Sequence, residues 1–344
     1  MRDRERPPRD GAAGHGVGRR TALGFFAALF GAVTLGAGVG EARADNKKPK
    51  PKKLKRVDKG SGGTTLFFAL DNAPFANDGK YNDATVIVFV PDYFRLPKNR
   101  EVDVVVHFHG HISTAERSIN GHLLREQLVD SKQNALLVVP QGPVMVRDSG
   151  AGKLEKAGGL KRLLRELVKE LGKADVVTAL GDASVKGLAG IGTVCLSAHS
   201  GGYLAAAYCL EHGGREVREV YLFDALYGKL EAFRSWVLAE TERPRRHKLM
   251  NFYAGGDPTA NSQNLLALLK ADGVRCYKEE KPGELTRAEL TKGQAIFIHT
   301  PLTHAEATFR HNALRDCLYA SVLKRYQGSD WFAAKNAPRK IDVR

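Results

Sequence analysis

A serine flanked by small residues stands between a buried strand and a helix. Residues 193–196 form an apolar run, which is followed by Ala198-His199-Ser200-Gly201-Gly202 and then by an alanine-rich helical pattern. Nucleophilic serines are held at such sharp strand-to-helix turns, where small neighbours let the two elements approach closely. A serine here could also merely cap the helix. Ser200 therefore indicates catalysis only if partners for it are found elsewhere in the chain.

A glycine-containing loop supplies the first partner. The motif His109-Gly110-His111 directly follows an apolar, valine-rich run. If Ser200 attacks a carbonyl carbon, backbone N–H groups near Gly110 and His111 would join that of Gly201 in holding the negative oxygen that develops. A glycine in such a loop lets the backbone come close to the substrate. We therefore expect an oxyanion hole at these three residues.

A carboxylate and an imidazole supply the remaining partners. Asp224 directly follows the apolar run 220–223, and His304 follows the run 295–298. In this arrangement Ser200 would attack, His304 would take and return its proton, and Asp224 would fix the imidazole tautomer. The carboxylate would also stabilise the imidazolium that forms. The sequence thus predicts a Ser-Asp-His triad.

The choice of carboxylate stays open at this point. Asp257 follows the run 249–253 and is a second candidate for the acid. However, Gly255-Gly256-Asp257-Pro258 is also typical of a turn that leads into a helix. We therefore favour Asp224 as the acid and keep Asp257 as the alternative.

These motifs make residues 64–326 resemble the α/β-hydrolase superfamily of serine esterases and lipases. The order Ser, Asp, His along the chain is the one this family uses. Ala198 stands where the family's G-x-S-x-G motif has its first glycine, and alanine is the mildest replacement. The resemblance implies hydrolysis of an ester, thioester or amide through an acyl-enzyme, with a carboxylic ester expected first and no cofactor.

Two other functions compete with this interpretation. Alternating strand positions place His107, His109 and His111 on one face, so a metal-dependent hydrolase is the first alternative. The second is a catalytically inactive protein that keeps the hydrolase fold and binds the cell envelope, because a fold alone does not prove activity. The metal hypothesis leaves the serine turn and His304 unexplained.

The elements that must position these residues alternate between apolar runs and amphipathic stretches. This alternation predicts a single α/β domain, residues 64–344, with an eight-stranded, mostly parallel sheet and helices on both faces. Little more than one helix fits between residues 225 and 247, so we expect an open site that accepts small or polymer-bound esters. The strands are expected at 65–70, 85–90, 104–108, 135–139, 193–196, 220–223, 249–253 and 295–298, and the helices at 160–171, 201–212, 230–240, 262–271 and 311–326.

The first 44 residues resemble a twin-arginine (Tat) export signal. Arg19-Arg20 precedes a mildly apolar run, residues 21–40, and Ala42-Arg43-Ala44 has the small-x-small pattern that signal peptidases cut. We expect cleavage before Asp45 and a bacterial protein that ends in the periplasm or outside the cell. Retention of the run as a membrane anchor is the alternative.

Residues 45–63 are rich in Lys and Pro, and we expect a linker there. The net charge is +15, but from Ser61 onward 38 Lys and Arg face 32 Asp and Glu, which leaves only +6. This distribution argues against nucleic acid as a partner. It allows the Lys-rich segment to contact anionic polymers or lipid head groups of the cell envelope.

The four cysteines do not form a disulfide framework. Cys195 lies in a strand pattern and Cys209 in a helix pattern, so we expect both to be buried free thiols. A bridge between Cys276 and Cys317 stays open, because export would permit it.

Overall fold

The computed structural model describes residues 52–60, 62–181, 184–239, 247–326, 335–339 and 341–344. All of these residues belong to one unit. The expected export signal, residues 1–44, and residues 45–51 of the expected linker lie outside the described residues.

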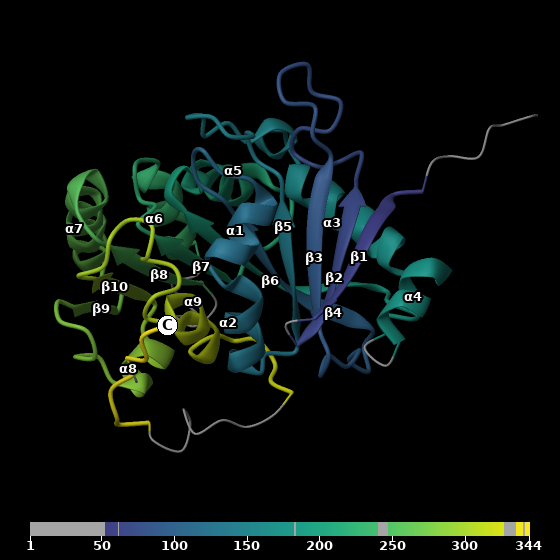
Figure 1. Ribbon diagram of the computed structural model, residues 1–344. Helices are drawn as coiled ribbons and strands as arrows, with labels where there is room; N and C mark the ends of the chain where they lie inside the picture. The colour runs from purple at the N-terminus through teal and green to yellow at the C-terminus, as the bar shows by residue number, and fades with distance from the viewer. Residues whose placement is uncertain (1–51, 61, 182–183, 240–246, 327–334, 340) are drawn as a thin grey trace, which may run out of the picture. The chain divides into compact units, whose positions relative to one another are not determined.

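Within the described residues, ten strands form one sheet in the order β1-β2-β3-β5-β4-β6-β7-β8-β10-β9 (Figure 1). Every neighbouring pair from β5 to β9 is parallel, whereas β1–β2, β2–β3 and β3–β5 are antiparallel. The predicted fold class, a mostly parallel α/β sheet, is confirmed, and its eight predicted strands are all present. The strands are β1 (Leu54–Gly60), β2 (Gly63–Ala69), β3 (Thr85–Pro91), β4 (Glu101–Phe108), β5 (Ala135–Pro140), β6 (Gly190–His199), β7 (Glu219–Phe223), β8 (Lys248–Tyr253), β9 (Cys276–Glu279) and β10 (Ala295–His299).

The two outermost strands, β1 and β9, are additions to the predicted eight. β1 lies inside residues 45–63, so the prediction of a linker is wrong for Leu54–Gly60. Both strands carry several charged residues, as edge strands often do, because charge on an edge discourages pairing with another chain. Part of the Lys-rich segment is also tied to the domain: the Arg56 guanidinium lies 3.5 Å from the centre of the Phe67 ring, and Lys53 pairs with Asp71 at 2.8 Å.

Helices cover both faces of the sheet, as predicted (Figure 1). Two predicted helices have other bounds, because α7 begins already at Gly256 and α9 spans only seven residues. In the described part of the chain, no helix is both long and apolar enough to cross a membrane. One face carries α1 (Ala115–Gly121), α2 (Leu124–Ser131), α8 (Arg287–Lys292) and α9 (Ala313–Tyr319), and the other carries α3 (Gly159–Leu171), α4 (Ala174–Leu180), α5 (Tyr203–His212), α6 (Leu230–Leu238) and α7 (Gly256–Ala271).

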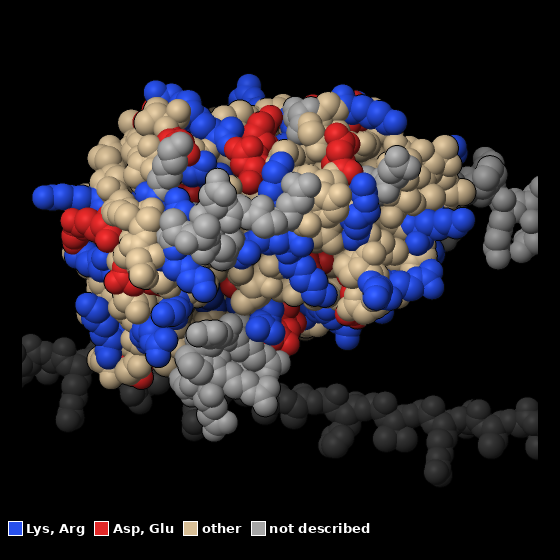
Figure 2. Space-filling view, turned by 90° about the horizontal axis from the view of Figure 1, so that it is seen from below, with Lys and Arg blue, Asp and Glu red and all other residues tan. Residues whose placement is uncertain are grey.

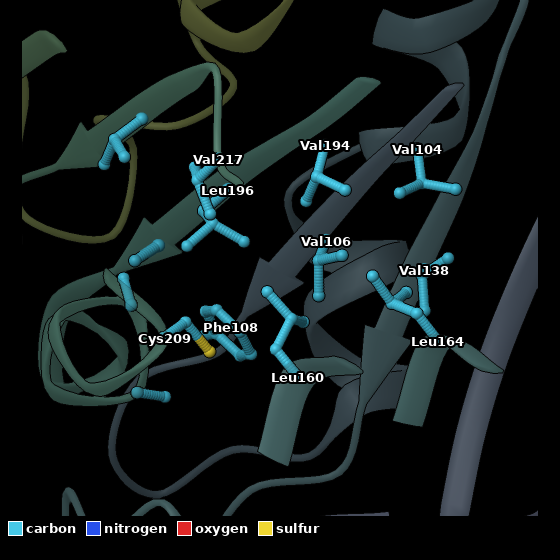
Figure 3. Close-up of a cluster of buried hydrophobic side chains, with 14 of the residues drawn as sticks. Val104, Val106, Phe108, Val138, Leu160, Leu164, Val194, Leu196, Cys209 and Val217 are labelled. Carbon is cyan, nitrogen blue, oxygen red and sulfur yellow. The ribbon is translucent and has the colours of Figure 1, made fainter. Parts of the chain in front are cut away.

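The leucine stripe predicted for residues 160–171 packs α3 against the sheet. Figure 3 shows Leu160 and Leu164 beside Val106 of β4 and Val138 of β5. Burying each such side chain contributes about 1.5–3 kcal/mol relative to leaving it in water. α3 therefore holds β4 and β5 in place, and the polar loops follow the carboxyl ends of these strands.

Charged side chains of both signs occupy the opposite edge of the sheet, where the parallel strands begin. Figure 2 views the domain from below and shows Lys and Arg scattered over this face with other residues between them. A hollow of about 330 Å³ there is lined by Glu101, Asp103 and Glu216 as well as by Arg215 and Arg218. Basic and acidic groups thus line this hollow together.

All four cysteines are free thiols. Cys195, Cys209 and Cys317 are buried, and Cys276 is partly buried. The expectation for Cys195 and Cys209 is confirmed, and no bridge joins Cys276 to Cys317.

Candidate active site

Polar residues that follow four strands gather at one edge of the sheet. Ser200 follows β6, Asp224 follows β7, His304 lies beyond β10, and the loop of residues 109–111 follows β4. These strands run parallel within one sheet, so their carboxyl ends share an edge. Open α/β sheets bind ligands at this edge. The structure thus brings the predicted site residues together.

Ser200 occupies the sharp turn that the sequence predicts. Its φ angle is +53°, in the left-handed region that non-glycine residues seldom adopt and that costs about 1–3 kcal/mol at such sites. Close packing surrounds the turn: a Cβ atom on Gly202 would lie 2.4 Å from the carbonyl oxygen of Phe108, and one on Gly110 would lie 2.6 Å from Cβ of Ser200. Only glycine fits at these two positions.

A chain of hydrogen bonds links the serine to a carboxylate. The hydroxyl of Ser200 lies 2.9 Å from Nε2 of His304, and Nδ1 of His304 lies 2.6 Å from Oδ2 of Asp224. The other carboxylate oxygen of Asp224 accepts the backbone N–H of Ala254 at 2.9 Å. With Nδ1–H donating to the carboxylate, Nε2 is free to accept the serine proton. Ser200 and Asp224 are buried, whereas 44% of the His304 side chain is exposed.

Asp257, the alternative acid, is not part of this chain. It lies exposed in the first turn of α7, and among the described residues no hydrogen bond joins it to His304. Asp224 instead has a φ of +44° directly after β7, and its own N–H donates to the carbonyl oxygen of Phe252 at 2.7 Å. This backbone fixes the direction of the Asp224 carboxylate toward His304.

The loop after β4 lies against the serine turn. His109 holds it there: Nδ1–H donates to the carbonyl oxygen of Gly110 at 2.8 Å, and Nε2 accepts from the backbone N–H of Gly142 at 2.9 Å and from the side chain of Gln141 at 2.8 Å. Burial lowers the pKa of His109. A neutral imidazole suits this pattern, because it needs one donor and one acceptor nitrogen.

His111 lies against Gly201, the residue that follows Ser200. Its Nε2 lies 2.7 Å from the hydroxyl of Ser149, and a Cβ atom on Gly201 would come within 2.6 Å of the His111 ring. Gly110, His111 and Gly201 thus meet beside Ser200, where the sequence places the oxyanion hole. Any larger residue at position 201 would have to push the His111 ring away.

The three histidines of the metal alternative do not converge. His107 is bonded within the core to the hydroxyls of Ser197 at 2.8 Å and Ser118 at 3.1 Å, while His109 and His111 are engaged in the loop. The residues described in the structure contain no group of three or more His, Cys, Asp or Glu arranged to hold a metal ion. The alternation that suggested a shared face ends at Phe108, where β4 ends and the chain turns into the loop.

The sequence analysis did not predict a row of buried histidines behind His304. The ring of His199 lies 4.7 Å from that of His304 and 4.5 Å from that of His122, and His122 lies 5.9 Å from His107. Nε2–H of His199 donates to the backbone carbonyl of His304 at 2.9 Å. No sequence spacing reveals this row, because its members come from β4, α1's end, β6 and the loop after β10.

The buried histidines of this row are held neutral. Burial, aided by the neighbouring imidazoles, lowers the pKa of His199 to about 3 and that of His122 to about 4. The same causes bring the pKa of His107 well below its usual value. Neutral rings here place no positive charge beside His304.

Comparisons with known proteins return distant structural likenesses. No protein-family model and no curated protein matches this sequence. Solved structures similar to this chain include a ferulic acid esterase (14% identity, TM-score 0.45, 68% of this chain and 90% of that chain), an S-formylglutathione hydrolase from Agrobacterium tumefaciens (12%, 0.42, 79% and 100%) and a feruloyl esterase module from Clostridium thermocellum (11%, 0.44, 82% and 93%). At this low identity and TM-score, the likeness says nothing about the activity of this chain.

The neutral histidines predict that acid destabilises the fold. Their pKa values are lower in the folded chain than the usual 6.5, so the unfolded chain binds protons that the folded chain refuses. The free energy of unfolding is therefore expected to fall as the pH drops from about 6.5 toward 4, by up to about 1.4 kcal/mol per pH unit for each histidine. Urea unfolding at several pH values measures this slope. The slope measures how many protons the chain takes up on unfolding, and in His199→Gln this number should be smaller by about one. An unchanged slope would show that His199 is protonated in the folded state.

Proposed function

We propose that this protein is an exported serine hydrolase that cleaves carboxylic esters. The observation that carries the proposal is the hydrogen-bonded chain from the Ser200 hydroxyl through His304 to Asp224. This chain has the geometry that nucleophilic catalysis requires, with nucleophile, base and orienting carboxylate in direct contact. The loop of residues 109–111, which we call the oxyanion loop, lies beside Ser200 and supports the same chemistry.

In the first half-reaction, Oγ of Ser200 attacks the carbonyl carbon of the ester while Nε2 of His304 takes the hydroxyl proton. The carbonyl oxygen becomes negative and is held by backbone N–H groups of Gly201 and of the loop at Gly110 and His111. The C–O bond to the alcohol then breaks, and His304 hands its proton to the departing oxygen. An acyl-enzyme on Ser200 and a free alcohol result.

In the second half-reaction, water replaces the alcohol. His304 takes a proton from the water, whose oxygen attacks the acyl carbon, and the bond to Ser200 breaks as the proton returns to Oγ. The products are a carboxylic acid and the restored serine. The exposure of the His304 side chain gives water and bulky alcohols access to the site. The substrate is therefore proposed to be a small-molecule or a polymer-bound ester, without a cofactor.

The triad is tested by active-site labelling and ester hydrolysis of the purified protein. Ser200→Ala and His304→Ala are expected to abolish labelling by a fluorophosphonate probe and to reduce hydrolysis of p-nitrophenyl acetate to background. Asp224→Asn should lower kcat by about 10³–10⁴, because the imidazole loses the carboxylate that fixes its tautomer. The matched variant Asp257→Asn should stay within about twofold of wild type, since no bond to His304 is lost.

Two outcomes would contradict this assignment. Equal losses of kcat in Asp224→Asn and Asp257→Asn would show that Asp224 is not the acid of the triad. A folded wild type that neither reacts with the probe nor hydrolyses esters would leave the binding-only alternative, an inactive envelope protein with this fold.

His199 supports the proposed base from behind. Its hydrogen bond to the carbonyl oxygen of His304, at 2.9 Å, holds the backbone of an otherwise exposed residue, and the two rings lie against each other. We propose that His199 is a positioning residue, which keeps Nε2 of His304 pointed at Ser200. It touches no reacting atom itself.

Two variants separate positioning from packing. His199→Gln keeps an N–H donor for the His304 carbonyl, whereas His199→Leu keeps bulk without a donor. We expect His199→Leu to lower kcat about 10- to 100-fold with little change in KM, and His199→Gln to retain most of the wild-type kcat. Steady-state kinetics on p-nitrophenyl acetate measures both. Equal losses in the two variants would mean that His199 only fills space.

We also propose that the protein is exported to the periplasm or beyond and that residues 47–52 contact anionic envelope polymers. Arg19-Arg20 and the Ala42-Arg43-Ala44 pattern support export, and the run of lysines supports the contact. Replacing Arg19 and Arg20 by Lys is expected to retain the chain in the cytoplasm, as measured by cell fractionation, while Arg43→Lys should not. High salt should release any envelope-bound wild type. Export of the Lys-Lys variant at the wild-type level would contradict the Tat assignment.

A further inference from the structure

Exposed apolar side chains cluster around the proposed active site. In the part of the chain that the structure describes, seven large hydrophobic side chains are exposed. Three of them, Ile112, Met145 and Val146, adjoin the oxyanion loop, and Tyr227 stands beside His304. Exposed apolar groups gathered at one place mark binding surfaces, whereas single ones are ordinary.

The first group forms one wall next to the oxyanion loop. Ile112 directly follows His111, and its N–H donates to the carbonyl oxygen of Val146 at 2.9 Å, while the N–H of Met145 donates to Ser113 at 3.1 Å. These bonds join the loop after β4 to the loop after β5 and hold the apolar side chains together. We name Ile112, Met145 and Val146 the loop wall.

Tyr227 forms the opposite side. Its ring stands edge-on to the His304 ring at 6.3 Å and lies 6.2 Å from the ring of Tyr203. Because His304 hands its proton to the departing oxygen, the alcohol part of an ester must leave on the His304 side. Tyr227 therefore stands where the alcohol part would pass.

The carbonyl carbon becomes tetrahedral when Ser200 attacks it, and three of its four substituents have fixed directions, which leaves one direction for the acyl chain. One substituent is Ser200, a second points into the oxyanion hole, and the third, the alcohol, points toward His304. The acyl chain extends away from His304, and we place it on the loop wall, because Ile112 directly follows His111, which lies against Gly201. Both sides of the site thus offer apolar surface to the substrate.

We infer that the substrates are esters with apolar groups on both sides of the scissile bond: an extended alkyl or aryl acyl chain that lies on the loop wall, and an apolar alcohol that contacts Tyr227. This inference rests on the proposed function and adds a substrate class to it. Short, polar esters such as acetylated sugars would leave both surfaces wet and gain nothing from them.

The test compares two series of soluble esters below their critical micelle concentrations. In the acyl series, p-nitrophenyl esters from acetate to octanoate, wild-type kcat/KM is expected to rise at least tenfold, because each buried methylene adds to transition-state binding. Met145→Ser and Val146→Ser should lower kcat/KM for the octanoate about tenfold and for the acetate less than twofold. In the alcohol series, phenyl against methyl acetate, Tyr227→Ser should reduce the preference for phenyl and leave the acyl series unchanged.

Val322→Ser is the matched control. Val322 is also exposed, but it lies at the amino end of the parallel strands, opposite the site, where its N–H donates to Glu219, the first residue of β7. The Val322→Ser variant should match wild type in both series. A flat acyl series, or loop-wall variants that weaken acetate and octanoate equally, would overturn the inference while fluorophosphonate labelling and turnover leave the proposed function standing. A preference for long acyl chains that appears only above the critical micelle concentration would also overturn the inference. It would indicate that the loop wall binds a lipid-like surface instead of a single acyl chain. Absence of both labelling and turnover would reject the proposed function and the inference together.

Discussion

The site depends on how closely β4, β6 and α5 approach one another at the serine turn. Ser200 keeps a positive φ only because the surrounding backbone fixes it, and that contact allows no side chain at Gly110 or Gly202. The same approach brings the loop of residues 109–111 against Ser200, the proposed nucleophile. The buried valines and leucines under these strands offset the cost of the strained turn, which is about 1–3 kcal/mol. The strained turn at Ser200 and the rigid packing beneath it thus depend on each other.

The second constraint is charge. A base that accepts a proton in the reaction becomes positive, and any fixed positive charge beside it would oppose that step. The ring of His199 lies against that of His304, and the ring of His122 lies against that of His199, yet burial lowers the pKa of His199 to about 3 and that of His122 to about 4. Neutral imidazoles can donate hydrogen bonds to backbone without adding charge. The Asp224 carboxylate, 2.6 Å from Nδ1, is the charged group in direct contact with the His304 ring.

Local patterns predicted the central strands well, because strands buried on both faces are continuously apolar, and residues that follow them fall at one edge. The edge strands β1 and β9 could not be predicted in this way, since they carry charge and lack an apolar run. Gln141 follows β5 directly, so the rule that located Asp224 would also have found it. The bond from His199 to the His304 carbonyl spans 105 residues. No local spacing encodes such a contact.

The open side of the site connects these constraints to substrate choice. Ser200 and Asp224 are buried, so the reacting groups are shielded from below, while the exposed His304 ring and the apolar residues around it face outward. Among the described residues, α6 is the only helix between β7 and β8, which leaves little chain to form a cover. We propose that the substrate itself contributes to excluding water from the carbonyl carbon during the attack by Ser200. An ester with apolar groups on both sides of the scissile bond can do this, because its own bulk displaces water from the loop wall and from Tyr227.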